Sequence, residues 1–312
     1  MENDMKRYIT IDGGTTNTRV YLVENCAIRD KRKITIGSGS ASAKERLAPE
    51  IKRAIDELLH KNGLKEKDIH RILASGMITS ELGLYTVAHS IAPIGIDGVR
   101  KDSREVMLPE ISSIPFFFIS GIKTVGDSPL DTNMMRGEET ELFGIMDGGE
   151  TIYILPGSHN KIIKVDTGGK VTDFMSTITG ELIAALIKDT ILSVSVDISS
   201  DEPSEEGVID GYLYAEKHGI NEALLKPRAL KVAGEVDNAY IYGFLMGAVL
   251  SGEIAPMLKM QERRVIIGGR KEIKEPLAVL LRRFSDKEIT VLDEAAVEAS
   301  AVRGAIKVFE GK

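Results

Sequence analysis

The chain has 312 residues, 43% of them hydrophobic and 28% charged, a composition that excludes a disordered chain and predicts two domains of about 150 residues each. Its net charge of -7 argues against a nucleic-acid partner, because that interaction depends on Lys and Arg that neutralise phosphates. The single cysteine, Cys26, excludes a disulfide within the chain and a cysteine-based metal cluster, and we expect a cytoplasmic protein.

The first predicted element is a hairpin over residues 8–24 with a polar tip. Gly13 and Gly14 let the backbone approach a ligand closely. The next residues offer donors that suit a phosphate: Thr15, Thr16, Asn17 and Thr18. Asp12 has the oxygen ligand that a Mg²⁺ shared with phosphates requires. A plain hairpin turn with polar side chains is the alternative.

Apolar spacing predicts the other elements of the first half. These are strands over 27–36, 70–74 and 115–119, and helices over 43–60 and 135–146. Residues 84–113 contain glycines and prolines and predict an irregular insertion. Residues 147–149 predict a hinge.

The second half repeats this order of elements, which indicates a duplication. Its predicted strands cover 151–155, 161–166, 171–176, 264–267 and 288–292, and its helices 179–192, 237–252, a segment ending near 284, and 293–308. A polar segment over 201–231 is expected to be inserted. The apolar run 240–252, which Glu253 and Pro256 end, is too short to span a bilayer, so we expect a buried helix and no membrane partner.

Each half therefore predicts an α/β domain, a mixed five-stranded sheet with helices on both faces. We place the domains at 1–148 and 149–312. Polar turns at 12–17 and 156–160 would lie at the tips of the two hairpins, where they could hold a nucleoside triphosphate from opposite walls of a cleft.

The motifs resemble the superfamily of sugar kinases, acetate kinase, actin and heat-shock chaperones, with its duplicated ribonuclease H-like domain. D-G-G-T-T-N-T-R at 12–19 is similar to its first phosphate motif, 157–159 to its second, and 267–269 to its adenosine motif. Three segments resemble the 2-dehydro-3-deoxygalactonokinase family: M-R-G-E-E-T-E-L-F-G at 135–144, L-P-G-S-H-N-K at 155–161 and S-T-I-T-G-E-L at 176–182. S-G-M-I-T-S at 75–80 is similar as well.

This resemblance implies ATP-dependent phosphorylation of the terminal 6-hydroxyl of 2-dehydro-3-deoxy-D-galactonate, a small-molecule sugar acid, in galactonate catabolism. It implies that the N-terminal domain binds the sugar acid and the C-terminal domain the adenosine. The family often has Asp where this chain has Asn133, so residue 133 is not expected to be an obligatory base.

The catalytic base is expected to be Glu138, with Glu139 second, although acids in a first helical turn can simply complement the helix dipole. Asp12 would hold Mg²⁺ and assist catalysis. Thr140 and Glu141 are expected to face partly outward. The residues expected to bind ATP are Gly13, Gly14, Thr15, Thr16, Asn17, Gly157, Ser158, His159, Thr179, Gly180, Gly268 and Gly269. Those expected to bind substrate are Arg136, Ser75, Gly76, Met77 and Ser80.

Several alternatives stay open at this point. Arg136 could instead form an interdomain salt bridge, Arg19 could contact a phosphate or pair with a neighbouring acid, and His159 could be merely exposed. A related kinase could act on 2-keto-3-deoxygluconate or a hexose, and an actin-like or chaperone-like ATP-driven switch is the rival from another class. The sequence leaves open the epimer preference and whether the chain forms a homodimer.

Overall fold

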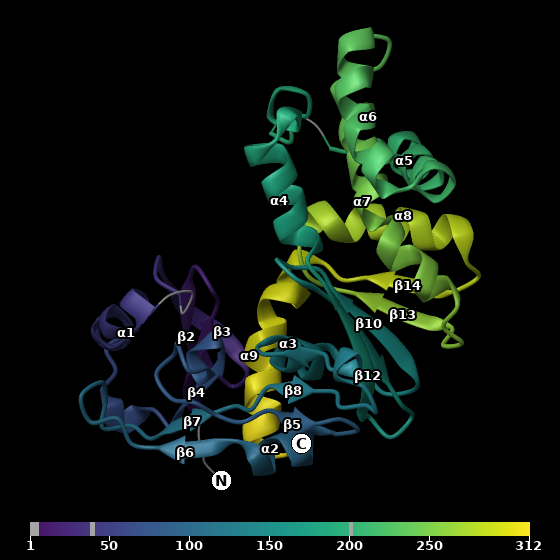
Figure 1. Ribbon diagram of the computed structural model, residues 1–312. Coiled ribbons are helices and arrows are strands. Elements are labelled where there is room, and N and C mark those ends of the chain that lie inside the picture. The colour runs from purple at the N-terminus through teal and green to yellow at the C-terminus, as the bar shows by residue number, and fades with distance from the viewer. Residues whose placement is uncertain (1–5, 38–40, 200–201) are drawn as a thin grey trace. The chain divides into compact units, whose positions relative to one another are not determined.

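The computed structural model describes residues 6–37, 41–199 and 202–312 (Figure 1). The chain divides into two compact units. The first unit contains Met1–Gly149, Asp166–Phe174 and Glu294–Lys312, and the second contains Glu150–Val165 and Met175–Asp293. Two segments expected in the second domain, Asp166–Phe174 and Glu294–Lys312, therefore belong to the first unit.

The first unit is built on a six-stranded sheet of order β3-β2-β1-β4-β7-β6. Its strands are β1 (Arg7–Gly13), β2 (Thr18–Glu24), β3 (Ala27–Ile34), β4 (Arg71–Gly76), β6 (Arg104–Val106) and β7 (Phe116–Phe118). β1, β2 and β3 pair antiparallel, whereas β1, β4 and β7 are parallel. These are the five predicted strands in the predicted directions, and β6 adds an antiparallel edge.

The insertion expected to be irregular contains short regular elements. They are β5 (Ser90–Ile91), α2 (Ile96–Asp102) and β6. β5 joins a small sheet of order β5-β8-β9 with β8 (Ile122–Lys123) and β9 (Met134–Met135). Elements of two to seven residues are too short to leave a hydrophobic period in the sequence, which is why the prediction was wrong here.

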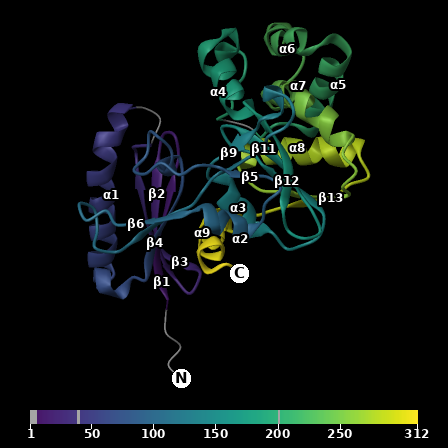
Figure 2. The same cartoon turned by 60° about the horizontal axis from the view of Figure 1, so that its bottom comes forward.

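Helices cover both faces of the first sheet (Figure 2). α1 (Ala41–Lys61) packs Leu47, Ile51 and Ile55 on one face. α9 (Glu294–Glu310) lies on the other face, where the ring centroids of Phe309 and Phe117 are 5.2 Å apart. This apolar packing explains why the last helix belongs to the first unit.

The helix α3 (Glu138–Ile145) packs against α9. A Cβ placed on Gly304 of α9 would lie 1.7 Å from the Thr140 carbonyl oxygen, so the two helices touch backbone to backbone. α3 begins three residues later than predicted, because Gly137 has a φ of 116° and is not helical.

The second unit is built on a five-stranded sheet of order β12-β11-β10-β13-β14. Its strands are β10 (Thr151–Leu155), β11 (Asn160–Val165), β12 (Val171–Thr177), β13 (Arg264–Ile267) and β14 (Glu288–Val291), and the division between the units falls within β12. β10 pairs antiparallel with β11 and parallel with β13, and β13 is parallel to β14. The strand order repeats that of β3-β2-β1-β4-β7, which confirms a duplicated ribonuclease H-like fold.

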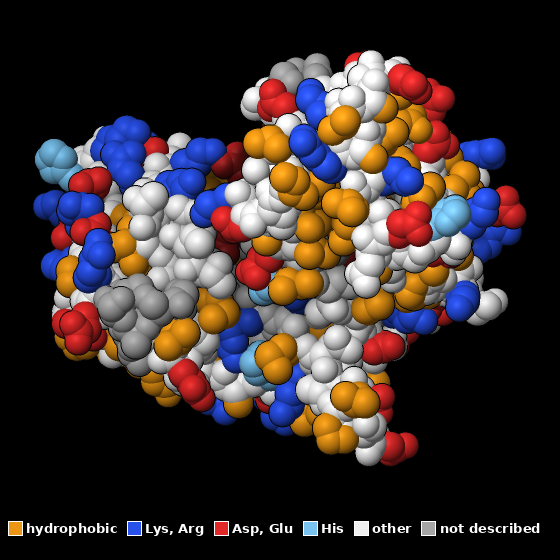
Figure 3. Space-filling model, turned by 45° about the horizontal axis from the view of Figure 1, so that its top comes forward, with side chains coloured by type: hydrophobic (Ala, Val, Ile, Leu, Met, Phe, Trp, Pro, Cys, Tyr) orange, Lys and Arg blue, Asp and Glu red, His pale blue; other side chains and the backbone are white. Residues whose placement is uncertain are grey.

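The helices of the second unit are α4 (Thr179–Asp189), α5 (Glu205–His218), α6 (Ile220–Ala233), α7 (Asn238–Leu258) and α8 (Lys271–Phe284). Hydrophobic side chains gather on the surface around α4 in Figure 3. Near α4, Ile178, Ile191 and Val194 are all more than half exposed.

The helix α7 is long and apolar enough to cross a membrane by length and composition alone, but 78% of its most apolar window is buried inside the protein. The predicted buried helix is therefore confirmed, while its predicted end is wrong. The helix continues past Glu253 and Pro256 to Leu258. The carboxylate of Glu253 is hydrogen-bonded inside the unit and does not end the helix.

Candidate active site

The 12–17 turn of the first unit lies against the end of β4. Parallel pairing sets Asp12 beside Ser75 and Gly13 beside Gly76. A Cβ on Gly76, whose φ is 81°, would lie 2.4 Å from the Gly13 carbonyl oxygen, so this crossing requires glycine. The Gly14 N–H closes the turn by donating to the Asn17 carbonyl oxygen at 2.9 Å.

Asp12 pairs with Arg19, whose Nη1 donates to Oδ2 at 2.9 Å. Of the two readings of Arg19, the structure thus shows the ion pair. Burial raises the pKa of Asp12, Arg19 opposes that rise, and the charge of Glu138 adds to it. Asp12 is nevertheless 23% exposed and can contact a ligand.

The two candidate bases turn back onto the start of their own helix. Oε2 of Glu138 accepts from the Arg136 N–H at 2.9 Å, and Oε2 of Glu139 accepts from the Gly137 N–H at 2.7 Å. Glu138 is half-buried, whereas Glu139 is fully buried and its Oε1 has no hydrogen-bond partner in the described chain. Burial and then the charge of Glu138 raise the pKa of Glu139 to about 8.

The sequence-based assignment missed Glu141, which was expected to face partly outward. Burial, followed by the charges of Asp12 and Glu138, raises the pKa of Glu141 to about 8, so it lies among the same carboxylates. Glu138 and Glu141 are three residues apart on one helix, a spacing that places them on one face and could have revealed the pair. Thr140 was also expected to face partly outward but is buried, with Oγ1 donating to the Gly137 carbonyl oxygen at 2.7 Å.

Arg136 follows β9 and binds the segment after β4. Its Nη1 donates to the carbonyl oxygen (2.8 Å) and the hydroxyl of Thr79, and its Nη2 donates to the Val87 carbonyl oxygen at 3.0 Å and lies 3.1 Å from Nδ1 of His89. Burial and the Arg136 charge lower the pKa of His89 to about 4, so the ring is neutral at pH 7. Both terminal nitrogens of Arg136 therefore already have protein partners.

The other residues predicted to bind substrate differ in accessibility. Ser75 and Gly76 are buried, and Ser75 Oγ lies 3.4 Å from Thr140 Oγ1. Met77 and Ser80 are half-buried, and Ser80 Oγ donates to the Met77 carbonyl oxygen at 2.6 Å. Met77 and Ser80 are thus the better placed to meet a substrate.

In the second unit, the three segments predicted to bind ATP converge. A Cβ on Gly180 would lie 1.9 Å from the Gly157 carbonyl oxygen, and one on Gly269 would lie 2.2 Å from that of Pro156. The Glu181 N–H donates to the Ser158 carbonyl oxygen at 3.0 Å. The 156–160 turn is therefore enclosed by the start of α4 on one side and by the turn after β13 on the other.

Arg270 and Glu181 contact side chains of this turn. Nη2 of Arg270, a residue not assigned a role from sequence, donates to Ser158 Oγ at 3.2 Å. Nε2 of His159, which is exposed, lies 3.3 Å from Oε1 of Glu181. Arg270 is the side chain here that brings a permanent positive charge to the turn.

Sequence reasoning also missed Glu253 of α7. This carboxylate is 2% exposed and accepts from Asn160 Nδ2 at 3.1 Å to each oxygen. The hydroxyls of Thr177 and Thr179 donate to its Oε1. The sequence feature that could have revealed Glu253 is that it is a single acidic residue within an apolar helix.

The family described as 2-keto-3-deoxy-galactonokinase matches residues 12–304, a range that contains both turns and all of these side chains. The chain belongs to this family. The 2-dehydro-3-deoxygalactonokinase of Escherichia coli strain K12 is 24% identical over 257 residues, which are 80% of each chain. A solved structure from Sinorhizobium meliloti, described as a candidate 2-dehydro-3-deoxygalactonokinase, covers 96% of each chain with a TM-score of 0.77 and 19% identity, a likeness of fold. The protein is thus an ATP-dependent sugar-acid kinase.

Within residues 6–37, 41–199 and 202–312, no group of three or more His, Cys, Asp or Glu side chains could hold a metal ion. Mg²⁺ is usually held by one or two carboxylates together with substrate phosphates and water, so this finding is compatible with a role for Asp12.

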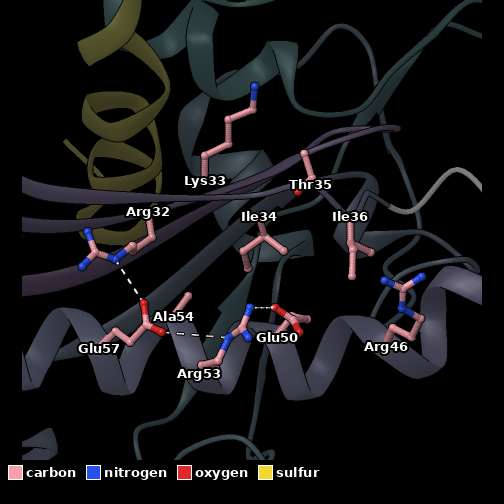
Figure 4. Close-up of a pocket in the computed structure, with 10 residues that line it drawn as sticks. All are labelled: Arg32, Lys33, Ile34, Thr35, Ile36, Arg46, Glu50, Arg53, Ala54 and Glu57. Carbon is pink, nitrogen blue, oxygen red and sulfur yellow. Dashed lines mark hydrogen bonds and ion pairs between the residues drawn. The ribbon is translucent and has the colours of Figure 1, made fainter.

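The kinase also has a basic groove of about 270 Å³ between β3 and α1 (Figure 4). Its lining residues are Arg32, Lys33, Ile34, Thr35, Ile36, Arg46, Glu50, Arg53, Ala54 and Glu57. Arg32 pairs with Glu57 at 3.2 Å, and Arg53 pairs with Glu50. The lining includes none of the predicted site residues, and part of its positive charge is neutralised.

Proposed function

We propose that this kinase transfers the γ-phosphoryl group of ATP to the terminal 6-hydroxyl of 2-dehydro-3-deoxy-D-galactonate, a step of galactonate catabolism. The observation that carries the proposal is the group of carboxylates Asp12, Glu138 and Glu141 beside the glycine-lined 12–17 turn. The family and the Escherichia coli relative support the choice of substrate.

Glu138 is the proposed general base. It is half-buried, and its charge contributes to raising the pKa of Asp12 in the 12–17 turn. Glu139 is fully buried, and an external hydroxyl cannot reach it without rearrangement of α3. Its bond to the Gly137 N–H suits it instead to fixing the start of the helix.

In the proposed step, the substrate hydroxyl gives its proton to the Glu138 carboxylate as its oxygen bonds to the γ-phosphorus. The bond from that phosphorus to the bridging oxygen breaks, and ADP leaves with the electron pair. This transfer needs positioning and charge neutralisation more than covalent help from the protein.

Asp12 is the proposed residue for Mg²⁺. Its carboxylate is a hard oxygen donor, it remains partly exposed, and the charge of Glu138 favours a cation nearby. When bound, Mg²⁺ would neutralise charge on the phosphate oxygens. Asp12→Asn should therefore lower the phosphorylation rate by orders of magnitude and raise the Mg²⁺ concentration needed for half-maximal rate, with the circular dichroism spectrum unchanged.

The 156–160 turn is proposed to bind ATP phosphates. The backbone N–H groups of Ser158 and His159 have no acceptor within the part of the chain that the structure describes, so they are available to an anion. Arg270 adds a guanidinium that suits phosphate. The adenosine is proposed to lie near Gly268 and Gly269.

Arg136 is proposed to contribute to binding of the sugar acid. Since both terminal nitrogens donate to Thr79, Val87 and His89, a direct contact with the substrate carboxylate would use the Nε–H or require one of these bonds to break. Arg136→Lys keeps the charge but loses the bidentate geometry. It should raise the KM for the sugar acid more than the KM for ATP.

The proposal is tested by ATP consumption with 2-keto-3-deoxygalactonate, 2-keto-3-deoxygluconate and free hexoses, and by phosphorus NMR of the product. The expected result is the highest kcat/KM with the galactonate acid and a phosphate on the 6-oxygen. A higher kcat/KM with 2-keto-3-deoxygluconate or a hexose would contradict the proposed substrate and identify that compound as the substrate instead. ATP turnover that only a protein partner accelerates would overturn the kinase step.

A further inference from the structure

Glu253 lies where a carboxylate is costly. The surrounding α7 positions are apolar and buried, among them Val249, Leu250 and Ile254. The side chains that donate hydrogen bonds to Glu253 are neutral: Asn160, Thr177 and Thr179. A buried charge of this kind is tolerated only when hydrogen bonds replace its water, and an apolar side chain would pack here without that cost.

The hydrogen bonds come from two segments distant in sequence from α7. Asn160 ends the 156–160 turn, whereas Thr177 ends β12 and Thr179 begins α4. All three donate to one carboxylate. Through these bonds, the Glu253 side chain ties the turn to the start of α4.

Glu253 also fixes the orientation of the Asn160 amide. Because the amide nitrogen donates to Glu253, the amide oxygen must point the other way, and it accepts from the Gly157 N–H at 3.1 Å. That bond uses the Gly157 N–H inside the turn and leaves those of Ser158 and His159 for a ligand. The carboxylate thus controls which donors of the turn are available.

We propose that Glu253 is a positioning residue of the ATP site, which acts through Asn160, Thr177 and Thr179 to hold the 156–160 turn and the start of α4 in the geometry that binds ATP phosphates. This inference rests on the proposed function only in taking the turn as a phosphate site. It does not depend on which sugar acid is the substrate.

The test substitutes Glu253→Gln in the full chain and measures binding of a non-hydrolysable ATP analogue by calorimetry, without any sugar acid. The three donors converge on Oε1, and Asn160 Nδ2 also donates to Oε2, so the Gln amide nitrogen would face at least one of these donors in either orientation. We expect analogue binding to weaken about tenfold. The KM for ATP should rise by a similar factor, with a smaller change in the KM for the sugar acid.

The matched control is Glu216→Gln on α5, an exposed glutamate in the same unit. It makes the same chemical change and should leave analogue binding unchanged. Wild-type affinity in Glu253→Gln would overturn the inference. An equal loss for both substrates would also do so, because it would indicate general damage to the unit.

If Glu253→Gln does not fold, Thr179→Val and Thr179→Ser replace it. Valine keeps the shape of threonine but removes the hydroxyl, whereas serine keeps the hydroxyl. Weaker analogue binding in Thr179→Val than in Thr179→Ser supports the inference, and equal binding overturns it. If the wild-type chain binds the analogue but phosphorylates no sugar acid, the proposed function is wrong. The binding comparison still tests the role of Glu253, because it uses no sugar acid.

Discussion

Arg19 and Asp12 lie directly opposite each other on β2 and β1, and the guanidinium of Arg19 donates to the Asp12 carboxylate at 2.9 Å. Burial raises the pKa of Asp12, and Glu138 adds to the rise, while Arg19 lowers it. Arg19 therefore favours the ionised form of Asp12, which is the form that could bind Mg²⁺.

Arg19→Gln should move the acidic limb of the kcat/KM profile for ATP to higher pH. Without the guanidinium, the pKa of Asp12 rises, so the carboxylate binds a proton at pH values where it is now ionised. The measurement is kcat/KM against pH, with Arg29→Gln, which disrupts the exposed pair with Glu24, as the control. An unshifted acidic limb would show that Asp12 does not limit activity there.

Glu138→Gln and Glu139→Gln should separate the two candidate bases. Loss of a general base lowers kcat by about 10²- to 10⁴-fold, and we expect that loss for Glu138. Gln at position 139 can still accept from the Gly137 N–H, so its loss of kcat should be smaller. Single-turnover rates at saturating ATP and sugar acid provide the measurement. The reverse order of effects would make Glu139 the base.

Glu139 should also make stability depend on pH. Its pKa in the folded protein is raised to about 8 from an ordinary value of 4.5, so the folded state keeps a proton that the unfolded chain loses. The stabilisation is full below about pH 4.5 and is lost as the pH rises toward about 8. In Glu139→Gln the thermal midpoint should fall less over this interval than in the wild type. A difference between the two proteins that is the same at every pH would contradict the assignment.

The paired hairpins and the parallel crossovers could be predicted because each strand carries its own pattern of apolar residues and ends in glycine or a polar turn. The position of α9 could not be predicted, because the sequence pattern of the second half indicates a final helix but not the sheet against which that helix packs. Gly304 and Phe309 decide the matter through contacts with α3 and β7. Thr140 was misplaced for the same reason, because α9 is what buries it.

The candidate site could be proposed from sequence where one segment carries all of its residues, as at 12–14 and 157–159. It was not predictable where a side chain acts across segments. Glu253 was interpreted as the end of an apolar helix, because charged residues are usually exposed to solvent. The residues that donate hydrogen bonds to it lie 74 to 93 residues away in sequence, so its burial could not be foreseen. Arg136 likewise gave no sign in sequence that its guanidinium is engaged by Thr79 and Val87.

The crossing of α9 over α3 should be sensitive to a single methyl group. In Gly304→Ala the new Cβ would lie 1.7 Å from the Thr140 carbonyl oxygen, so the helices must separate at a cost on the order of 1–3 kcal/mol of unfolding free energy. Gly252→Ala on α7, where nothing lies within 4 Å, should instead stabilise the protein by about 0.5–1 kcal/mol.

Urea unfolding of both glycine variants gives the two free energies, and kcat gives a second readout. Because Thr140 lies two residues from Glu138 on the same helix, a shift of α3 should lower kcat in Gly304→Ala but not in Gly252→Ala. Equal stability changes for the two variants would mean that the contact between α3 and α9 is looser than the structure shows. A destabilised Gly304→Ala with full kcat would mean that α3 keeps Glu138 in place without help from α9.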